Sequence, residues 1–81
     1  MELCAGVIGI ANKNPKEISE QINNIVWNYR SVISGRMGIP RHDRDAGIIS
    51  LIVEGSAREV KDLEDALKTV EGLSVKSLYF T

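Results

Sequence analysis

The sequence predicts an α+β fold in which a four-stranded antiparallel sheet carries two helices on one face. Three observations carry this prediction. Apolar runs and amphipathic segments alternate in the order strand, helix, strand, strand, helix, strand; each helix begins with capping residues; and a polar turn joins the two middle strands. A chain of 81 residues has room for one domain, so we expect residues 1–81 to form a single unit.

The first part of the chain is expected to form a buried strand followed by an amphipathic helix. Residues 4–11 are an apolar run that ends at the turn-like residues 12–15. Asn14, Pro15 and Glu17 mark a helix start, because Asn is a good N-cap, Pro fits the first helical position and Glu completes a capping box. An apolar stripe at helical spacing follows, formed by Ile18, Ile22, Ile25, Val26 and Tyr29.

The middle of the chain is expected to form a β-hairpin. Residues 31–39 alternate between an apolar and a more polar face, which is typical of a strand with one wetter side. Pro40 ends this strand, and the polar residues 41–46 form the turn. Residues 47–54 are rich in Ile and Val and predict the partner strand.

The last part of the chain repeats the strand-and-helix pairing of the first. Ser56 and Glu59 form a second capping box. The apolar stripe behind it consists of Val60, Leu63, Leu67 and Val70. Gly72 suits the end of this helix, and residues 73–80 form the last strand. With right-handed crossovers, this order of elements gives a ferredoxin-like βαββαβ sandwich.

Composition and charge exclude several classes of partner. The net charge is −1, so the basic excess of a nucleic-acid-binding protein is missing and we expect no direct DNA binding. No apolar run approaches the roughly 18 residues that a membrane-spanning helix needs. The N-terminal residues do not resemble a signal peptide, and the one cysteine cannot form an internal disulfide. A cytoplasmic location is therefore expected.

The face of the sheet away from the helices is expected to mediate self-association. Apolar residues alternate onto both faces of the first and third strands, and an exposed apolar patch marks an interaction site. We therefore expect a homo-oligomer, either a dimer or a tetramer. Arg36 and Gly38 are assigned to this open face, opposite Ile33 and Met37. Trp27 points away from the first helix stripe and either anchors a contact or lies flat on the surface.

Neither a metal site nor a catalytic site has support in the sequence. A closed transition-metal site needs about four donors, whereas Cys4 and His42 are the only cysteine and histidine. We interpret Cys4 as a small buried apolar residue and His42 as part of a solvated turn. With one histidine, no nucleophile–base pair has local support, so we expect no cofactor, no metal and no enzymatic activity.

Residues 12–14 are the candidate binding segment that local sequence suggests. Asn12, Lys13 and Asn14 lie where the first strand leads into a helix N-terminus, and such a junction presents free N–H groups that bind anions. The segment lacks the glycine spacing of a phosphate-binding loop. Every strand-to-helix junction has these groups, so we favour an ordinary capped turn over an anion site for these residues.

Three segments resemble a known family. They are Ile33–Pro40, Gly47–Val53 and Gly72–Ser77, and Arg36–Pro40 is the most specific part. They look like the small regulators assigned to iron-only hydrogenase systems, whose fold is similar to ACT domains and to the C-terminal domain of the nickel-responsive repressor. The resemblance implies regulation and, by analogy to ACT domains, a ligand at a subunit interface near Gly9 and residues 12–14.

Two parts of the nickel-responsive repressor have no counterpart here, namely its histidine cluster and its DNA-reading segment. Nickel sensing therefore does not carry over. The leading hypothesis is a small regulatory module that self-associates and senses a small-molecule effector. One alternative is a protein-interaction subunit without a small-molecule ligand, and a second is a metal-sensing domain.

Overall fold

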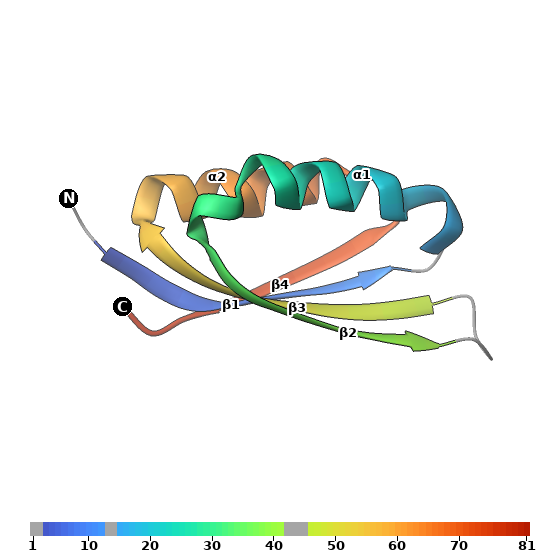
Figure 1. The fold of residues 1–81 in the computed structure, drawn as a ribbon, viewed down its shortest axis with the longest axis horizontal. Coiled ribbons are helices and arrows are strands. Elements are labelled where there is room, and N and C mark those ends of the chain that lie inside the picture. Colours follow the sequence, from blue (N-terminus) through green and yellow to red (C-terminus); the bar gives the residue numbers. More distant parts are fainter. Residues whose placement is uncertain (1–2, 13–14, 42–45) are drawn as a thin grey trace.

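The computed structural model describes residues 3–12, 15–41 and 46–81. Over these residues, the elements are β1 (Leu3–Asn12), α1 (Pro15–Asn28), a 3₁₀ turn η1 (Arg30–Val32), β2 (Ile33–Arg41), β3 (Ala46–Ser56), α2 (Ala57–Lys68) and β4 (Leu73–Tyr79). The strands form one antiparallel sheet in the order β2-β3-β1-β4. Both helices cover the same face of this sheet (Figure 1). The predicted ferredoxin-like βαββαβ fold is confirmed.

Capping residues fix both ends of α2 as the sequence predicts. The Ser56 hydroxyl accepts a hydrogen bond from the Glu59 backbone N–H at 3.2 Å and donates one to Glu59 Oε1 at 3.1 Å. After the helix, Gly72 has a φ of 89°, a left-handed conformation that glycine adopts without a steric penalty. The corresponding N-cap of α1 was predicted at Asn14, which lies outside the described residues.

The core lies between the sheet and the helices. Alternate residues of β1 and β3 point into it, and they meet one stripe from each helix. The side chains with almost no exposure are Ile8, Ile10, Ile22, Leu51, Val53, Val60, Leu63 and Leu67. Every apolar residue predicted for the two helix stripes is buried or packs against this cluster, so the predicted core is confirmed.

A β-bulge in β2 corrects one prediction of the sequence analysis. The register shifts between Ile33, which lies opposite Val53, and Gly35, which lies opposite Ile52. The extra residue reverses the alternation that follows, because directly opposite residues of paired strands share a face. Arg36 is opposite the buried Leu51 and Gly38 is opposite Ile49, so both lie on the helix-side face. The assignment of Arg36 and Gly38 to the open face was therefore wrong.

The same bulge places Met37 on the open face. Met37 lies opposite Ser50 and is 70% exposed, whereas the alternation counted from Ile33 had predicted that it would face the helices. An insertion of one residue flips every following side chain, because the side-chain period of a strand is two. A hydrophobic residue thus joins the face that no described helix covers.

Gly6 allows β4 to approach β1 closely at the end of the sheet. A Cβ atom on Gly6 would clash with the carbonyl oxygen of Leu78 and would lie 2.9 Å from the Tyr79 Cα. Both of these are backbone atoms, so neither can move away as a flexible side chain would. Gly9, three residues along the same strand, has more room, since the nearest atom to its Cβ would be the Lys76 oxygen at 3.7 Å.

The substitution Gly6→Ala is therefore expected to lower the free energy of unfolding by about 1–3 kcal/mol, the usual cost of overpacking. Gly47→Ala is the matched control, because no atom lies within 4 Å of the Cβ that it would add and Gly47 is away from the open face. It should be neutral or slightly stabilising, since alanine restricts the unfolded chain more than glycine does. Urea denaturation followed by circular dichroism measures both variants. Equal stability of the two variants would show that the close approach at Gly6 is unimportant.

Candidate functional site

The candidate site is the open face of the sheet, opposite the helices. β1 lies at its centre and contributes Leu3, Ala5, Val7, Gly9 and Ala11. Register places three rows across it: Gly35, Ile52, Val7 and Leu78; then Met37, Ser50, Gly9 and Lys76; then Ile48, Ala11 and Ser74. Among the described residues, no helix or strand covers this face (Figure 1).

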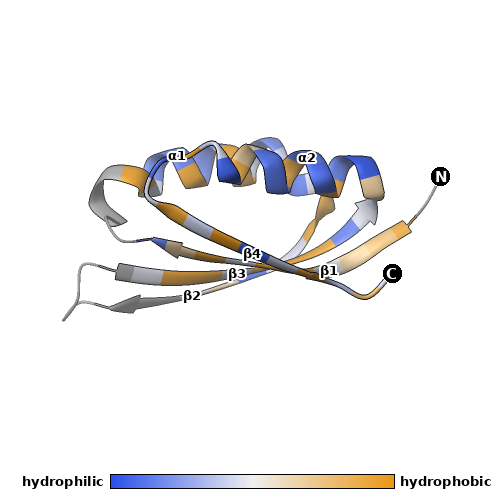
Figure 2. Cartoon of the chain, turned by 180° about the vertical axis from the view of Figure 1, so that it is seen from behind, coloured by the Kyte–Doolittle hydropathy of each residue, from blue (hydrophilic) through white to orange (hydrophobic). Residues whose placement is uncertain are grey.

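Large apolar side chains on this face are exposed. Ile48 and Ile52 are each 53% exposed, and Leu78 is 61% exposed. In Figure 2, hydrophobic positions recur along the strands as well as on the helices. Single exposed apolar residues are ordinary on a protein surface, but neighbours across adjacent strands form a contiguous patch, and such patches mark interaction sites. The predicted apolar character of the open face is confirmed.

The predicted ligand-binding residues do not share one face. Gly9 is on the open face, between Ser50 and Lys76. Asn12 ends β1 on the helix side, where it is 3% exposed. Lys13 and Asn14 lie outside the described residues. A small ligand on the open face would therefore contact Gly9 but not the side chain of Asn12.

Trp27 lies on the outer surface of α1, as the helical spacing predicts, and is 65% exposed. Arg30 stacks on it, with the guanidinium carbon 4.2 Å from the ring centroid, which is a cation–π geometry. Arg30 Nη1 also donates a hydrogen bond to the Trp27 carbonyl at 2.8 Å. Trp27 belongs to α1 and Arg30 to η1, so the pair is not part of the open sheet face.

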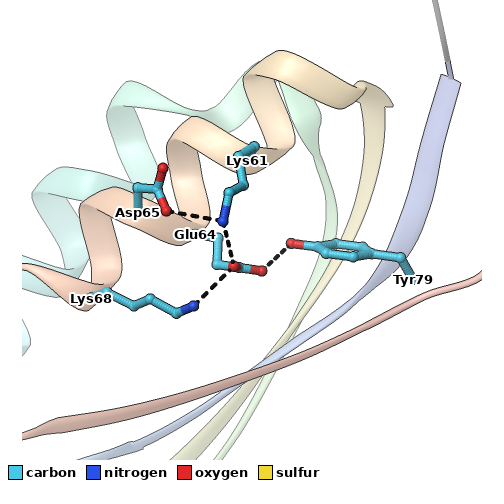
Figure 3. Close-up of polar contacts among 5 residues, drawn as sticks. All are labelled: Lys61, Glu64, Asp65, Lys68 and Tyr79. Carbon is cyan, nitrogen blue, oxygen red and sulfur yellow. Dashed lines mark hydrogen bonds and ion pairs between the residues drawn. The ribbon is translucent and has the colours of Figure 1, made fainter.

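A buried carboxylate, Glu64, ties α2 to β4 (Figure 3). Its Oε1 accepts hydrogen bonds from Lys68 Nζ at 3.0 Å and Lys61 Nζ at 3.3 Å. Its Oε2 accepts one from the Tyr79 hydroxyl at 2.5 Å. The Glu64 side chain is only 8% exposed, whereas both lysines reach solvent. Lys61 also pairs with the exposed Asp65 at 3.3 Å.

These contacts set the ionisation of the cluster. Hydrogen bonds from Ser77 and Tyr79, with smaller contributions from Lys68 and Lys61, lower the pKa of Glu64 to about 2. Burial raises the pKa of Tyr79, and its hydrogen bond to the Glu64 carboxylate raises it further. The Glu64 carboxylate therefore stays negatively charged, and both of its oxygens accept hydrogen bonds. Such a carboxylate suits a structural anchor better than a proton-transfer group.

Glu64 was not among the candidate residues predicted from the sequence. A signal was present. Glu64 is four residues after Val60, which places it at the edge of the apolar stripe, and Lys61 and Lys68 are at pairing distance three residues before it and four after it. The partner Tyr79 is 15 residues away, and only the fold brings it close.

Two further findings concern metals and membranes. The described residues contain no group of three or more His, Cys, Asp or Glu side chains that could hold a metal ion. None of their helices is long and apolar enough to cross a membrane. His42, the predicted turn histidine, is outside the described residues, and Cys4 is buried as predicted.

The fold and its one-sided helix layer define an ACT-like domain. The chain is similar to the ACT domain of GTP pyrophosphokinase from Chlorobium tepidum, with a TM-score of 0.73 and 19% identity over 96% of this chain and 89% of that one. It is also similar to CPII, a nitrogen regulatory PII-like protein from Thiomonas intermedia K12, with a TM-score of 0.55 and 11% identity over 98% and 95% of the two chains. At these identities, both likenesses show the fold alone.

The chain belongs to the TM1266-like family, described as "Iron-only hydrogenase system regulator, putative", whose family model matches residues 5–77. The uncharacterized protein TM1266 from Thermotoga maritima has a TM-score of 0.90 and 21% identity, with 99% of this chain and 100% of that chain covered. No curated protein matches the sequence. The family resemblance drawn from the sequence is confirmed.

The Glu64 cluster predicts a loss of stability in acid. The folded-state pKa of Glu64 lies below its ordinary value of 4.5, so its contribution is fully present above that pH and disappears as the pH falls towards about 2. Between about pH 5 and pH 2, the wild-type protein should lose on the order of 1–3 kcal/mol more stability than Glu64→Gln does.

Urea denaturation over this pH range checks the acid-stability prediction. Asp65→Asn is the matched control, because Asp65 is on the same helix but its side chain is 58% exposed. The control should keep the wild-type pH dependence. If Glu64→Gln also kept it, the carboxylate would not be the anchor of β4.

Proposed function

We propose that this chain is a non-enzymatic regulatory module that self-associates through its open sheet face and senses a small ligand. Membership of a regulator family supports the regulatory role. The single observation that carries self-association is the contiguous apolar patch of Ile52, Val7 and Leu78 on a face without a covering element among the described residues. A sheet with one packed face and one apolar open face is stabilised when a second layer covers it.

Burial of the apolar side chains on the open face would offset part of the entropic cost of association. Complete burial of a Leu or Ile side chain contributes about 1.5–3 kcal/mol relative to full exposure. Ile48, Ile52, Met37 and Leu78 each have more than half of their surface in water. Their burial in a dimer would contribute several kcal/mol against the entropic cost of association, on the order of 4–15 kcal/mol. A small domain also gains stability from oligomerisation.

The proposed interface consists of different residues from those the sequence suggested. Arg36 and Gly38 lie on the helix-side face of β2, and Trp27 lies on the outer surface of α1. A dimer built on the open face therefore has Ile52, Val7 and Leu78 at its centre instead. We expect a dimer, or a tetramer if a second surface also contributes.

Ligand sensing is the second half of the proposal. CPII from Thiomonas intermedia K12 has been solved bound to ADP, AMP and bicarbonate. The segment that the sequence suggests for such an anion is Asn12, Lys13 and Asn14, of which the structure describes Asn12 at the end of β1. Gly9, on the open face, would contact a ligand only within the subunit interface. We infer that a ligand at either place acts by changing the self-association equilibrium.

A protein-interaction subunit without a small ligand is the alternative function. The exposed Trp27 with Arg30 stacked on it favours this alternative, because tryptophan and arginine are enriched among the residues that dominate protein–protein binding energy. In that case the helix layer would bind the partner.

We also propose a cytoplasmic location and the absence of catalysis. The absence of catalysis agrees with the buried Glu64 carboxylate, because both of its oxygens already accept hydrogen bonds.

Self-association is tested with Ile52→Asp. A charge in the centre of the patch should raise the dimer dissociation constant at least about 100-fold, since an uncompensated buried charge costs several kcal/mol. The monomer should stay folded, because Ile52 is 53% exposed within it. Trp27→Ser is the control and should leave the dissociation constant unchanged. Sedimentation equilibrium at micromolar concentration measures both variants.

A wild-type protein that sediments as a monomer of 8.9 kDa at these concentrations would refute the proposal. Dissociation by Trp27→Ser with an intact Ile52→Asp oligomer would instead move the interface to the helix layer.

Ligand sensing is tested by a thermal-shift screen of amino acids, nucleotides and metal ions. A ligand that binds only the folded state at 100 times its dissociation constant stabilises it by about 2.7 kcal/mol, which for a domain this small raises the melting temperature by roughly 10 °C or more. We expect a nucleotide or another small anion to give the shift. A shift with a metal ion would support the metal-sensing alternative. No shift with any compound would favour the interaction subunit.

A further inference from the structure

Among the residues whose side chains the structure describes, two charged side chains lie on the open face. They are Glu54 on β3 and Lys76 on β4, and both are exposed. The ion pairs found within the described residues join Lys61 or Lys68 to Glu64 or Asp65 on α2, so neither open-face charge takes part in them. An acidic and a basic side chain at the edge of an apolar patch favour a partner surface that has a basic and an acidic side chain at the matching positions.

Register places these two charges symmetrically about Val7. Val7 lies opposite Ile52 on one side and opposite Leu78 on the other. Glu54 lies opposite Ala5, two residues before Val7, and Lys76 lies opposite Gly9, two residues after Val7. Glu54 is therefore one strand to one side of Val7 and two residues towards one end of β1. Lys76 is one strand to the other side and two residues towards the other end.

This placement makes the open face complementary to itself. A twofold axis that lies in the plane of the interface, passes through Val7 and runs perpendicular to the line from Glu54 to Lys76 exchanges the two positions. In a twofold interface, if one residue contacts a second, the second contacts the first in return. The axis thus sets each Glu54 against Lys76 of the partner subunit, and the two Val7 side chains meet at the centre.

Side-chain sizes agree with the same axis. Neighbouring strands lie about 4.8 Å apart, and two residues along a strand span about 6.8 Å. The row of Ile52, Val7 and Leu78 runs across the strands of its own sheet. With these spacings, the twofold rotation places this row nearly parallel to β1 of the other copy. Ile52 of the partner subunit then lies over Gly9, and the partner's Leu78 lies over Ala5. Large side chains meet small ones, and the strands of the two copies cross at roughly 70°, nearer to orthogonal than to aligned sheet packing.

We infer that two copies of this chain associate face to face about a twofold axis at Val7, with Glu54 of each copy paired to Lys76 of the partner subunit. This inference rests on the proposed self-association and specifies its register. The apolar row supplies most of the affinity. The rim ion pairs contribute little affinity by themselves but disfavour other registers, because like charges would then meet.

Charge reversal tests the inference. Glu54→Lys sets two lysines against each other at both pairs, and Lys76→Glu does the same with two glutamates. Each variant alone should dimerise at least about tenfold more weakly than wild type in low salt, as like-charge contacts predict. An equimolar mixture of the two variants should dimerise about as well as wild type, because both pairs in the mixed dimer are again attractive. The doubly reversed chain should do the same.

Glu20→Lys is the matched control, since Glu20 is an exposed acid on α1, and it should leave dimerisation unchanged. Sedimentation equilibrium of the single variants, their mixture and the double variant gives all the dissociation constants.

Single reversals that dimerise like wild type, or a mixture that regains nothing, would overturn the proposed register. If Ile52→Asp still dissociated the dimer in that case, self-association through the open face would stand without this register. If Ile52→Asp also had no effect, the proposed interface itself would be wrong.

Discussion

Alternation of side chains along β1 is the constraint on which the rest of the structure depends. β1 is hydrogen-bonded to β3 and β4 at the centre of the sheet, and its residues point in turn to the helix layer and to the open face. Ile8 and Ile10 are buried beneath the helices, which fixes Val7 and Gly9 on the other side. A core on one face and an apolar open face on the other therefore follow from the same ten residues, so neither can be changed without regard to the other.

The Glu64 cluster connects this constraint to the position of β4. β4 is an edge strand, and its last residues pair with β1 where Gly6 leaves room for Tyr79. The hydrogen bond from Tyr79 to Glu64 holds this end of β4 against α2, and the neighbouring Leu78 is thereby presented on the open face. Contacts on the helix side thus help to position a residue of the proposed interface on the opposite side.

The fold could be predicted from the sequence because its signals are local: two capping boxes, two helical stripes and a strand pattern with a period of two. The candidate site was predicted as the open face of the sheet, but Arg36 and Gly38 were assigned to that face by an alternation that the structure does not follow. One bulge between Ile33 and Gly35 reversed the faces of Arg36 and Met37, and a bulge leaves no clear mark in the alternation of a short strand. Glu64 and Tyr79 meet only through tertiary packing, and Val7, Glu54 and Lys76 acquire their symmetry from strand register, which a single sequence does not specify.

The most direct test of this account is a measurement of contacts between subunits. Isotope-filtered nuclear Overhauser spectroscopy on a mixture of labelled and unlabelled protein detects only hydrogen atoms that are close across the interface. The account predicts intermolecular signals from the methyl groups of Val7, Ile52 and Leu78, which lie in one row on the open face. Intermolecular signals confined to Trp27 and the outer surface of α1, with none from this row, would contradict it.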